Sequence, residues 1–166
     1  MIINIILISG LLASFYLDIK FRKIPNYITF VVIVSGITYH SVANGLEGLL
    51  FSTTGIIIGI LLLFIPFFLG GVGAGDVKLL GAIGAVMGAK FTIYAFLISA
   101  VIGGLISFII IMKNGRLGFF FKSILFTVLY REKTDITSSE PKERFTIPYG
   151  VPIVIGTFSM MIWGGF

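Results

Sequence analysis

The stretch that decides the fold is GGVGAGDVKLLGAIGAVMG, residues 70–88. It places one acidic residue, Asp76, between a glycine-rich turn and a long apolar run. Glycine permits backbone conformations and close approaches that other residues resist. An acidic group at the edge of a membrane span is costly and is usually retained for a function. The stretch therefore predicts a short helix that starts near Asp76 and a candidate site at its first turn.

The composition around this stretch is that of a membrane protein. Charged residues make up only 11% of the chain and hydrophobic residues 57%, whereas a soluble domain is about one quarter charged. We expect an all-α, multispanning membrane protein whose 166 residues form a single integral membrane domain. The absence of cysteine excludes disulfides, thiolate catalysis and cysteine-based zinc sites. The net charge of +5 lies in a few loops, as membrane topology requires, and does not indicate nucleic acid.

Apolar runs predict six spans, at about residues 2–17, 27–40, 49–69, 76–88, 91–112 and 151–163. The first run lacks a basic start and a small-residue cleavage site, so we interpret it as a retained span and not as a signal peptide. The apolar stretch 77–112 is divided at 88–90, because a single helix of that length would extend about 54 Å. The hydrocarbon core of a bilayer is only about 30 Å thick.

The distribution of basic residues gives this topology its orientation. With six spans, the loops 18–26, 70–78 and 113–145 lie on one side and contain all Lys and Arg residues except Lys90. Because cytoplasmic loops carry the excess of basic residues, both chain ends are expected outside and both Asp18 and Asp76 at the cytoplasmic face. Within the cytoplasmic loop between spans five and six, residues 116–130 are predicted to form an interfacial helix.

The two aspartates at span ends, Asp18 and Asp76, form the sharpest functional signal. Two carboxyl groups that share a site cannot both ionise readily, so one retains a proton while the other can act as a general base on water. The helix dipole favours the anion at Asp76 and the proton at Asp18. This chemistry requires neither a metal nor a cofactor. In the alternative interpretation Asp76 only caps its helix, and Asp18 pairs with Lys20 or Arg22.

Several other residues are predicted to support the site. Glycines in the turn would let an extended substrate lie against the backbone, and a proline and an asparagine begin span two, with the asparagine as N-cap. The lysine two residues after Asp76 either influences its carboxyl group or extends to the interface. The irregular entry to span six either lines the site or only begins a helix. These supporting residues are Gly73, Gly75, Lys78, Pro25, Asn26, Pro148, Tyr149 and Gly150.

Three motifs resemble those of the prepilin peptidases, the GxGD class of membrane aspartic proteases. They are D-x-K-x-x-x-I-P-N at residues 18–26, G-x-G-D-x-K-L at 73–79 and I-P-Y-G-V-P at 147–152. The short chain looks most like the form that serves tight-adherence (Flp) pili. Archaeal preflagellin peptidases also use a pair of aspartates and are similar in this respect. The resemblance implies that Asp18 and Asp76 are the catalytic pair of an enzyme in the prokaryotic cytoplasmic membrane.

The resemblance also implies the partners. The substrates would be prepilins and pseudopilins, cut at the cytoplasmic face after a short basic leader, in contact with the lipid bilayer and without nucleic acid. Larger members of the family carry a cysteine-containing cytoplasmic domain and also N-methylate their product. This chain lacks that insertion and has no cysteine, which argues against methyltransferase activity.

Two other classes of function compete with the protease. A small proton-coupled transporter would use Asp18 and Asp76 as proton carriers, but transporters often contain internal repeats and none is evident here. A structural membrane subunit would use both aspartates only as helix caps. The oligomeric state and the individual pilin substrate are not encoded in any motif of the sequence.

Overall fold

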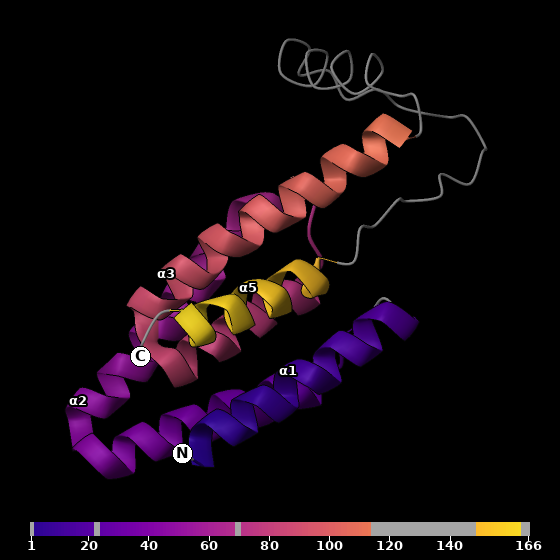
Figure 1. The fold of residues 1–166 in the computed structure, drawn as a ribbon. Coiled ribbons are helices and arrows are strands. Elements are labelled where there is room, and N and C mark those ends of the chain that lie inside the picture. Colours follow the sequence, from indigo (N-terminus) through magenta and orange to yellow (C-terminus); the bar gives the residue numbers. More distant parts are fainter. Residues whose placement is uncertain (1, 22–23, 69–70, 114–148, 164–166) are drawn as a thin grey trace, which may run out of the picture. The chain divides into compact units, whose positions relative to one another are not determined.

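The computed structural model describes residues 2–21, 24–68, 71–113 and 149–163, and these are helical apart from short turns. The helices are α1 (Ile2–Phe21), α2 (Asn26–Phe68), α3 (Ala74–Lys113) and α5 (Gly150–Trp163), shown in Figure 1. The all-α prediction is therefore confirmed for this part of the chain. The predicted interfacial helix at 116–130 and Pro148 lie outside the described residues. Contacts divide the chain into one unit of residues 1–103 with 146–166 and another of residues 104–145.

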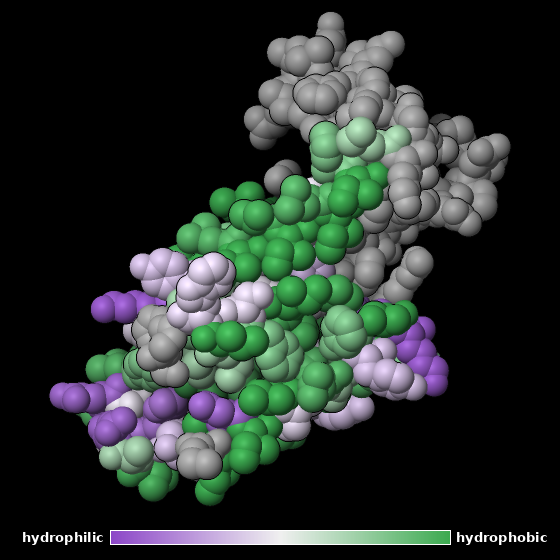
Figure 2. Space-filling view, viewed as in Figure 1, coloured by the Kyte–Doolittle hydropathy of each residue, from purple (hydrophilic) through white to green (hydrophobic). Residues whose placement is uncertain are grey.

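Three helices are long and apolar enough to cross a membrane: α1, α2 and the part of α3 from Ala74 to Ile109. The fourth, α5, is apolar but shorter. Large apolar side chains such as Phe30, Ile65 and Trp163 are exposed on the helices. Figure 2 shows apolar side chains covering the visible helix faces, with polar ones gathered toward helix ends. Such faces are suited to contact with lipid, as expected of a membrane protein.

Two of the long helices are broken at a glycine. Gly45 in α2 has φ 58° and ψ −130°, and Gly88 in α3 has φ 77° and ψ 174°. Both backbone conformations lie at positive φ, where glycine meets no steric penalty. The breaks fall within 41–48 and 88–90, the segments predicted to connect spans two with three and four with five. These connections are thus sharp breaks between helical segments, with no extended loop.

The helix ends differ from the predicted span ends by a few residues. Helix α1 extends to Phe21, beyond the predicted end at 17, so Asp18 lies within its last turn. Helix α3 begins at Ala74, because the carbonyl of Gly73 accepts hydrogen bonds from the N–H groups of Asp76 (3.1 Å) and Val77 (3.4 Å). Both aspartates consequently belong to helices and are held by regular backbone.

The first segment of α3, residues 74–87, packs against both segments of α2. A Cβ atom on Gly55 would overlap the carbonyl oxygen of Gly84, and the reverse also holds. On the other segment of α2, a Cβ on Gly36 would lie 2.7 Å from the carbonyl oxygen of Ala85. Gly55 with Gly59 and Gly84 with Gly88 have G-x-x-x-G spacing, which is typical of membrane helices that meet backbone to backbone, as these do. Helix α1 in turn packs against α2 and α5.

Candidate active site

Gly150 is the point at which the two aspartates meet. A Cβ atom on Gly150 would lie 2.5 Å from Oδ2 of Asp18 and 3.3 Å from Oδ1 of Asp76. These two carboxylate oxygens are therefore at most about 6 Å apart, the sum of the two distances. That separation brings two residues 58 positions apart in the sequence within reach of a single water molecule or peptide group. The prediction that tertiary structure unites Asp18 and Asp76 agrees with this geometry.

The first turn of α3 orients Asp76. Its Oδ2 accepts a hydrogen bond of 3.1 Å from the backbone N–H of Gly73, which is the residue that caps the helix. This bond from the third helical position back to the cap is the second half of a capping box. Asp76 therefore does cap α3, as the structural alternative proposed. A simple cap is normally solvated, however, whereas Asp76 is only 7% exposed and its other oxygen faces Gly150.

Asp18 lies in the last turn of α1 and is 5% exposed. Its Oδ2 has no hydrogen-bond partner among the residues that the structure describes. Lys20 does not pair with it: the Nζ atom donates to the hydroxyl of Tyr16 at 3.3 Å and lies over the rings of Tyr16 and Phe21. Arg22, the other suggested partner, lies outside the described residues. Among the described residues, Asp18 therefore has no basic partner, and of the two suggested ion pairs the one with Lys20 is not formed.

Lys78 and Asn26 form a direct contact that the sequence did not indicate. The Nζ atom of Lys78 donates a hydrogen bond of 2.9 Å to Oδ1 of Asn26. Asn26 was predicted to cap α2 with this same oxygen, and that prediction is wrong. The cap is supplied instead by Pro25, whose carbonyl accepts from the N–H of Ile28 at 3.2 Å. The bond between Lys78 and Asn26 ties the first turn of α3 to the start of α2.

The other predicted supporting residues border the same region. Tyr149 precedes α5 and caps it, since its carbonyl accepts from the N–H of Ile153 at 3.3 Å. Burial raises the pKa of the Tyr149 phenol, and the negative charge of Asp76 raises it further. The phenol therefore stays neutral and can donate a hydrogen bond near the aspartates. Gly75 packs against Ile24, where an added Cβ would lie 3.1 Å from the Cβ of Ile24.

Ser14 was not singled out in the sequence analysis. It lies one helical turn before Asp18 in α1 and is fully buried, and its hydroxyl has no hydrogen-bond partner in the described part of the chain. The signal available in the sequence was its spacing: residues four apart share a helix face, so a serine at 14 must face the same way as Asp18.

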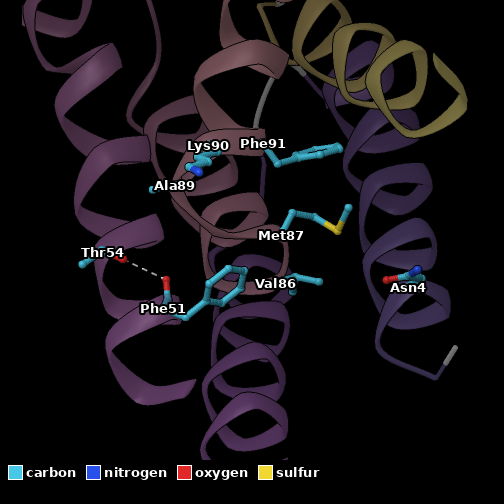
Figure 3. Close-up of a pocket in the computed structure, with 8 residues that line it drawn as sticks. All are labelled: Asn4, Phe51, Thr54, Val86, Met87, Ala89, Lys90 and Phe91. Atoms are coloured by element: carbon cyan, nitrogen blue, oxygen red, sulfur yellow. Dashed lines mark hydrogen bonds between the residues drawn. The ribbon is translucent and has the colours of Figure 1, made fainter. Parts of the chain in front are cut away.

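One hollow near these helices lies away from the aspartates. It has a volume of about 620 Å³ and is lined by Asn4 of α1 together with α2 and α3 residues around the Gly88 break. In Figure 3, Met87 and Phe91 point from α3 toward α1. Asn4 precedes Asp18 by fourteen residues, about 21 Å along a helix. None of the predicted site residues lines this hollow, so it is not the candidate active site. Among the described residues, no cluster of three His, Cys, Asp or Glu side chains could hold a metal ion.

Comparison with known protein families decides the classification. The model of the type IV leader peptidase family matches residues 5–108, more than half of the chain. The protein belongs to the type IV leader peptidase family. The matched region contains Asp18 and Asp76 with their surroundings, whereas Tyr149 and Gly150 lie beyond it. Neither a curated protein nor a solved structure is similar enough to this leader peptidase family member to count as a match.

Membership of this family supports a leader peptidase-type protease that acts on pilin-type proteins in general. The apolar helices agree with a membrane location. Nothing in the match supports the transporter alternative.

Proposed function

We propose that this protein is a membrane aspartic endopeptidase in which Asp18 and Asp76 form the catalytic pair. The observation that carries the proposal is that a Cβ atom on Gly150 would lie 2.5 Å from Asp18 Oδ2 and 3.3 Å from Asp76 Oδ1, which puts the two oxygens within about 6 Å of each other. Carboxyl groups at this separation couple their ionisation, so the pair as a whole titrates in two steps and is populated with a single shared proton. A pair in that state holds one base and one acid, as peptide hydrolysis requires.

In the proposed reaction, Asp76 is the base. It sits at a helix N-terminus and accepts the Gly73 N–H, and both features favour its anion. Asp76 removes a proton from a water, the water oxygen bonds to the peptide carbonyl carbon, and protonated Asp18 donates to the carbonyl oxygen. The tetrahedral intermediate then collapses as the C–N bond breaks and the leaving amine takes the proton held by Asp76. One hydroxyl of the intermediate returns its proton to Asp18 as the carboxylic acid forms. Two neutral products result, and the pair again holds one proton, on Asp18.

The remaining residues are assigned supporting parts in this proposal. The turn containing Gly73 and Gly75 offers backbone against which an extended substrate can lie. Tyr149 supplies a neutral hydroxyl near Asp76, suited to hold a substrate carbonyl. Lys78 and Asn26 keep the starts of α2 and α3 together, which maintains the position of Asp76.

The substrates that we propose are prepilins and pseudopilins with a short basic leader, cut at the cytoplasmic face of a prokaryotic cytoplasmic membrane. The basic loops beside both aspartates support this orientation. The breaks at Gly45 and Gly88 support six crossings, since Gly45 divides α2 into two segments close to the length of a span. Gly88 divides α3 into a short first segment and a second one long enough to span. Flp-type pilins and archaeal preflagellins are both substrates of the proposed kind. The missing cysteine-containing insertion supports an enzyme that cleaves without N-methylation.

Co-expression with a candidate prepilin tests the catalytic assignment. The unmutated chain should shorten the prepilin, whereas Asp18→Asn and Asp76→Asn should each abolish shortening while the variant remains in the membrane. N-terminal sequencing of the product identifies the cleaved bond and any methyl group. Unchanged cleavage by either variant would remove that aspartate from the mechanism, and a transporter or structural subunit would not shorten the prepilin at all.

A further inference from the structure

The hydroxyl of Ser14 departs from the pattern that three other buried hydroxyls of this protein follow. In a membrane helix, Ser and Thr normally satisfy the hydroxyl by donating to the backbone carbonyl of the preceding turn. Buried hydroxyls do so at Thr92 (2.7 Å to Gly88), at Ser99 (2.6 Å to Ala95) and at Thr157 (2.7 Å to Ile153). Ser14 is equally buried, yet its Oγ is bonded to no group in the described part of the chain.

A second buried polar atom without a partner lies one turn further along the same helix. It is Oδ2 of Asp18. Side chains at positions i and i+4 are neighbours on a helix, with Cβ atoms about 5–6 Å apart. The third such atom in the described residues, Oγ of Ser41, belongs to α2 close to its Gly45 break. Only Ser14 and Asp18 therefore present two unpaired polar atoms next to each other.

An unpaired buried polar atom destabilises a protein, because it has lost its water and gained no partner. Two such atoms that are neighbours but do not bond each other are commonly joined by an ordered water. A water at this place can donate to the acceptor Oδ2 of Asp18 and accept the O–H of Ser14. The carboxyl group of Asp18 would then be fixed from the interior side of α1, while its other contact is with Gly150.

We infer that Ser14 is a positioning residue that holds Asp18 through one bound water. The inference rests on the proposed catalytic role of Asp18. Ser14 itself does not touch substrate in this arrangement. Its hydroxyl holds the water that donates to Oδ2 of Asp18, and this hydrogen bond limits the rotation of the Asp18 carboxyl group.

Ser14→Ala tests this, with Ser99→Ala as the matched control, because Ser99 is an equally buried serine whose hydroxyl is already bonded to backbone. Both variants are made in the full chain in lipid nanodiscs and assayed on a prepilin that the unmutated chain cleaves. For Ser14→Ala we expect kcat to fall about tenfold with KM changed less than about twofold. Because Asp18 acts in its protonated form, loss of a donor to its carboxylate should also move the alkaline limb of the kcat–pH profile to higher pH. Ser99→Ala should match the unmutated chain.

A spectroscopic measurement gives a readout that does not depend on cleavage. The infrared C=O stretch of protonated Asp18 is identified by its loss in Asp18→Asn. It should move to higher wavenumber in Ser14→Ala, because a carbonyl that loses a hydrogen bond stiffens, and it should not move in Ser99→Ala.

The outcomes separate this inference from the proposed function. If the unmutated chain cleaves prepilin and Ser14→Ala cleaves equally well while unfolding at a higher temperature, the hydroxyl is merely unpaired and the inference is overturned. An unmoved infrared band overturns it as well. If the unmutated chain cleaves nothing, the proposed function fails, and the infrared comparison alone still decides whether Ser14 and Asp18 share a water.

Discussion

Gly150 illustrates how much one residue controls in this protein. Its backbone N–H donates to the carboxyl group of Asp18, and any side chain at this position would enter the space beside Oδ2 of Asp18 and Oδ1 of Asp76. As the first residue of α5 it also carries an N–H group that has no partner within the helix. Because Gly150 has no side chain, the two carboxyl groups can approach each other at this position.

We expect Gly150→Ala to lower prepilin cleavage by about 100-fold, because the methyl group must displace one carboxyl group by the order of 1 Å. Cleavage rates in nanodiscs measure this. The control is Gly104→Ala, whose Cβ would meet no atom within 4 Å. If Gly150→Ala cleaved at the rate of Gly104→Ala, the contact between Gly150 and the aspartates would have no catalytic significance.

The pKa of the Tyr149 phenol can be used to test whether Asp76 lies close to it. Burial is the larger cause of its raised pKa and the charge of Asp76 the smaller one. Replacing Asp76 by Asn removes only the second cause, so the pKa of Tyr149 should fall but remain above its ordinary value of 10.0. The measurement is the alkaline ultraviolet titration of tyrosine, with Tyr149→Phe subtracted to isolate this residue. An Asp76→Asn variant in which the Tyr149 titration is unchanged would place the phenol outside the influence of Asp76.

At the scale of helices, the site is built where the start of α3 meets the start of α2 and the end of α1. The bond between Lys78 and Asn26 joins two of these ends directly. Deeper in the protein, α3 and α2 are joined through the backbone contact of Gly55 with Gly84. One connection is polar and lies near the proposed cytoplasmic face, and the other is a close apolar contact. Their loss should therefore have different consequences.

For the polar connection, a double-mutant cycle is the appropriate experiment. Lys78→Met and Asn26→Leu should each reduce kcat/KM, and the double variant should be no worse than the more impaired single variant. We expect a coupling energy of about 1 kcal/mol, because the partly exposed bond is screened by solvent. Strictly additive effects would mean that the two side chains act independently and that the bond does not position Asp76.

For the apolar connection, Gly84→Ala should lower the free energy of unfolding by about 1–3 kcal/mol, because the new methyl group overlaps the carbonyl of Gly55 and forces the helices apart. Thermal unfolding in detergent, followed by circular dichroism, measures the change. The control is Gly71→Ala, where the nearest atom to an added Cβ is the Pro66 carbonyl oxygen at 3.6 Å, an ordinary contact. Equal stability of the two variants would contradict the backbone-to-backbone packing.

Within the unit formed by residues 1–103 and 146–166, the two aspartates and the two helix breaks lie at different places along the helices. The aspartates meet at the ends of α1 and the start of α3, whereas the breaks at Gly45 and Gly88 lie far from them along the chain. His40, to which the sequence assigned no role, connects the regions of these breaks. Its Nε2 lies 2.8 Å from the carbonyl oxygen of Val86, two residues before Gly88. A carbonyl only accepts, so Nε2 carries the proton in this bond.

The proposed topology predicts which positions are accessible from each side of the membrane. Because the chain has no cysteine, single cysteines can be introduced at Lys20 and Lys90 and treated with a membrane-impermeant maleimide on intact cells. We expect labelling at position 90 and none at position 20 until the membrane is permeabilised. Labelling of both positions from outside would contradict a cytoplasmic site and the six-span arrangement.

The sequence by itself indicated an all-α membrane protein, where its helices break, and which two aspartates the fold brings together. These properties follow from local features: apolar runs, glycines that accept positive φ, and carboxyl groups that are costly beside lipid. It also identified the G-x-x-x-G contacts, because small residues at that spacing favour close packing in any membrane helix.

Only the tertiary structure decided what lies between the aspartates. Three features depend on how separate helices are rotated and placed. They are the position of Gly150 beside both carboxyl groups, the bond from Lys78 to Asn26 and the unpaired hydroxyl of Ser14. Asn26 shows the reason. Its local pattern is that of a helix cap, but a lysine 52 residues away takes its side-chain oxygen, and no local rule anticipates a partner that packing alone brings near.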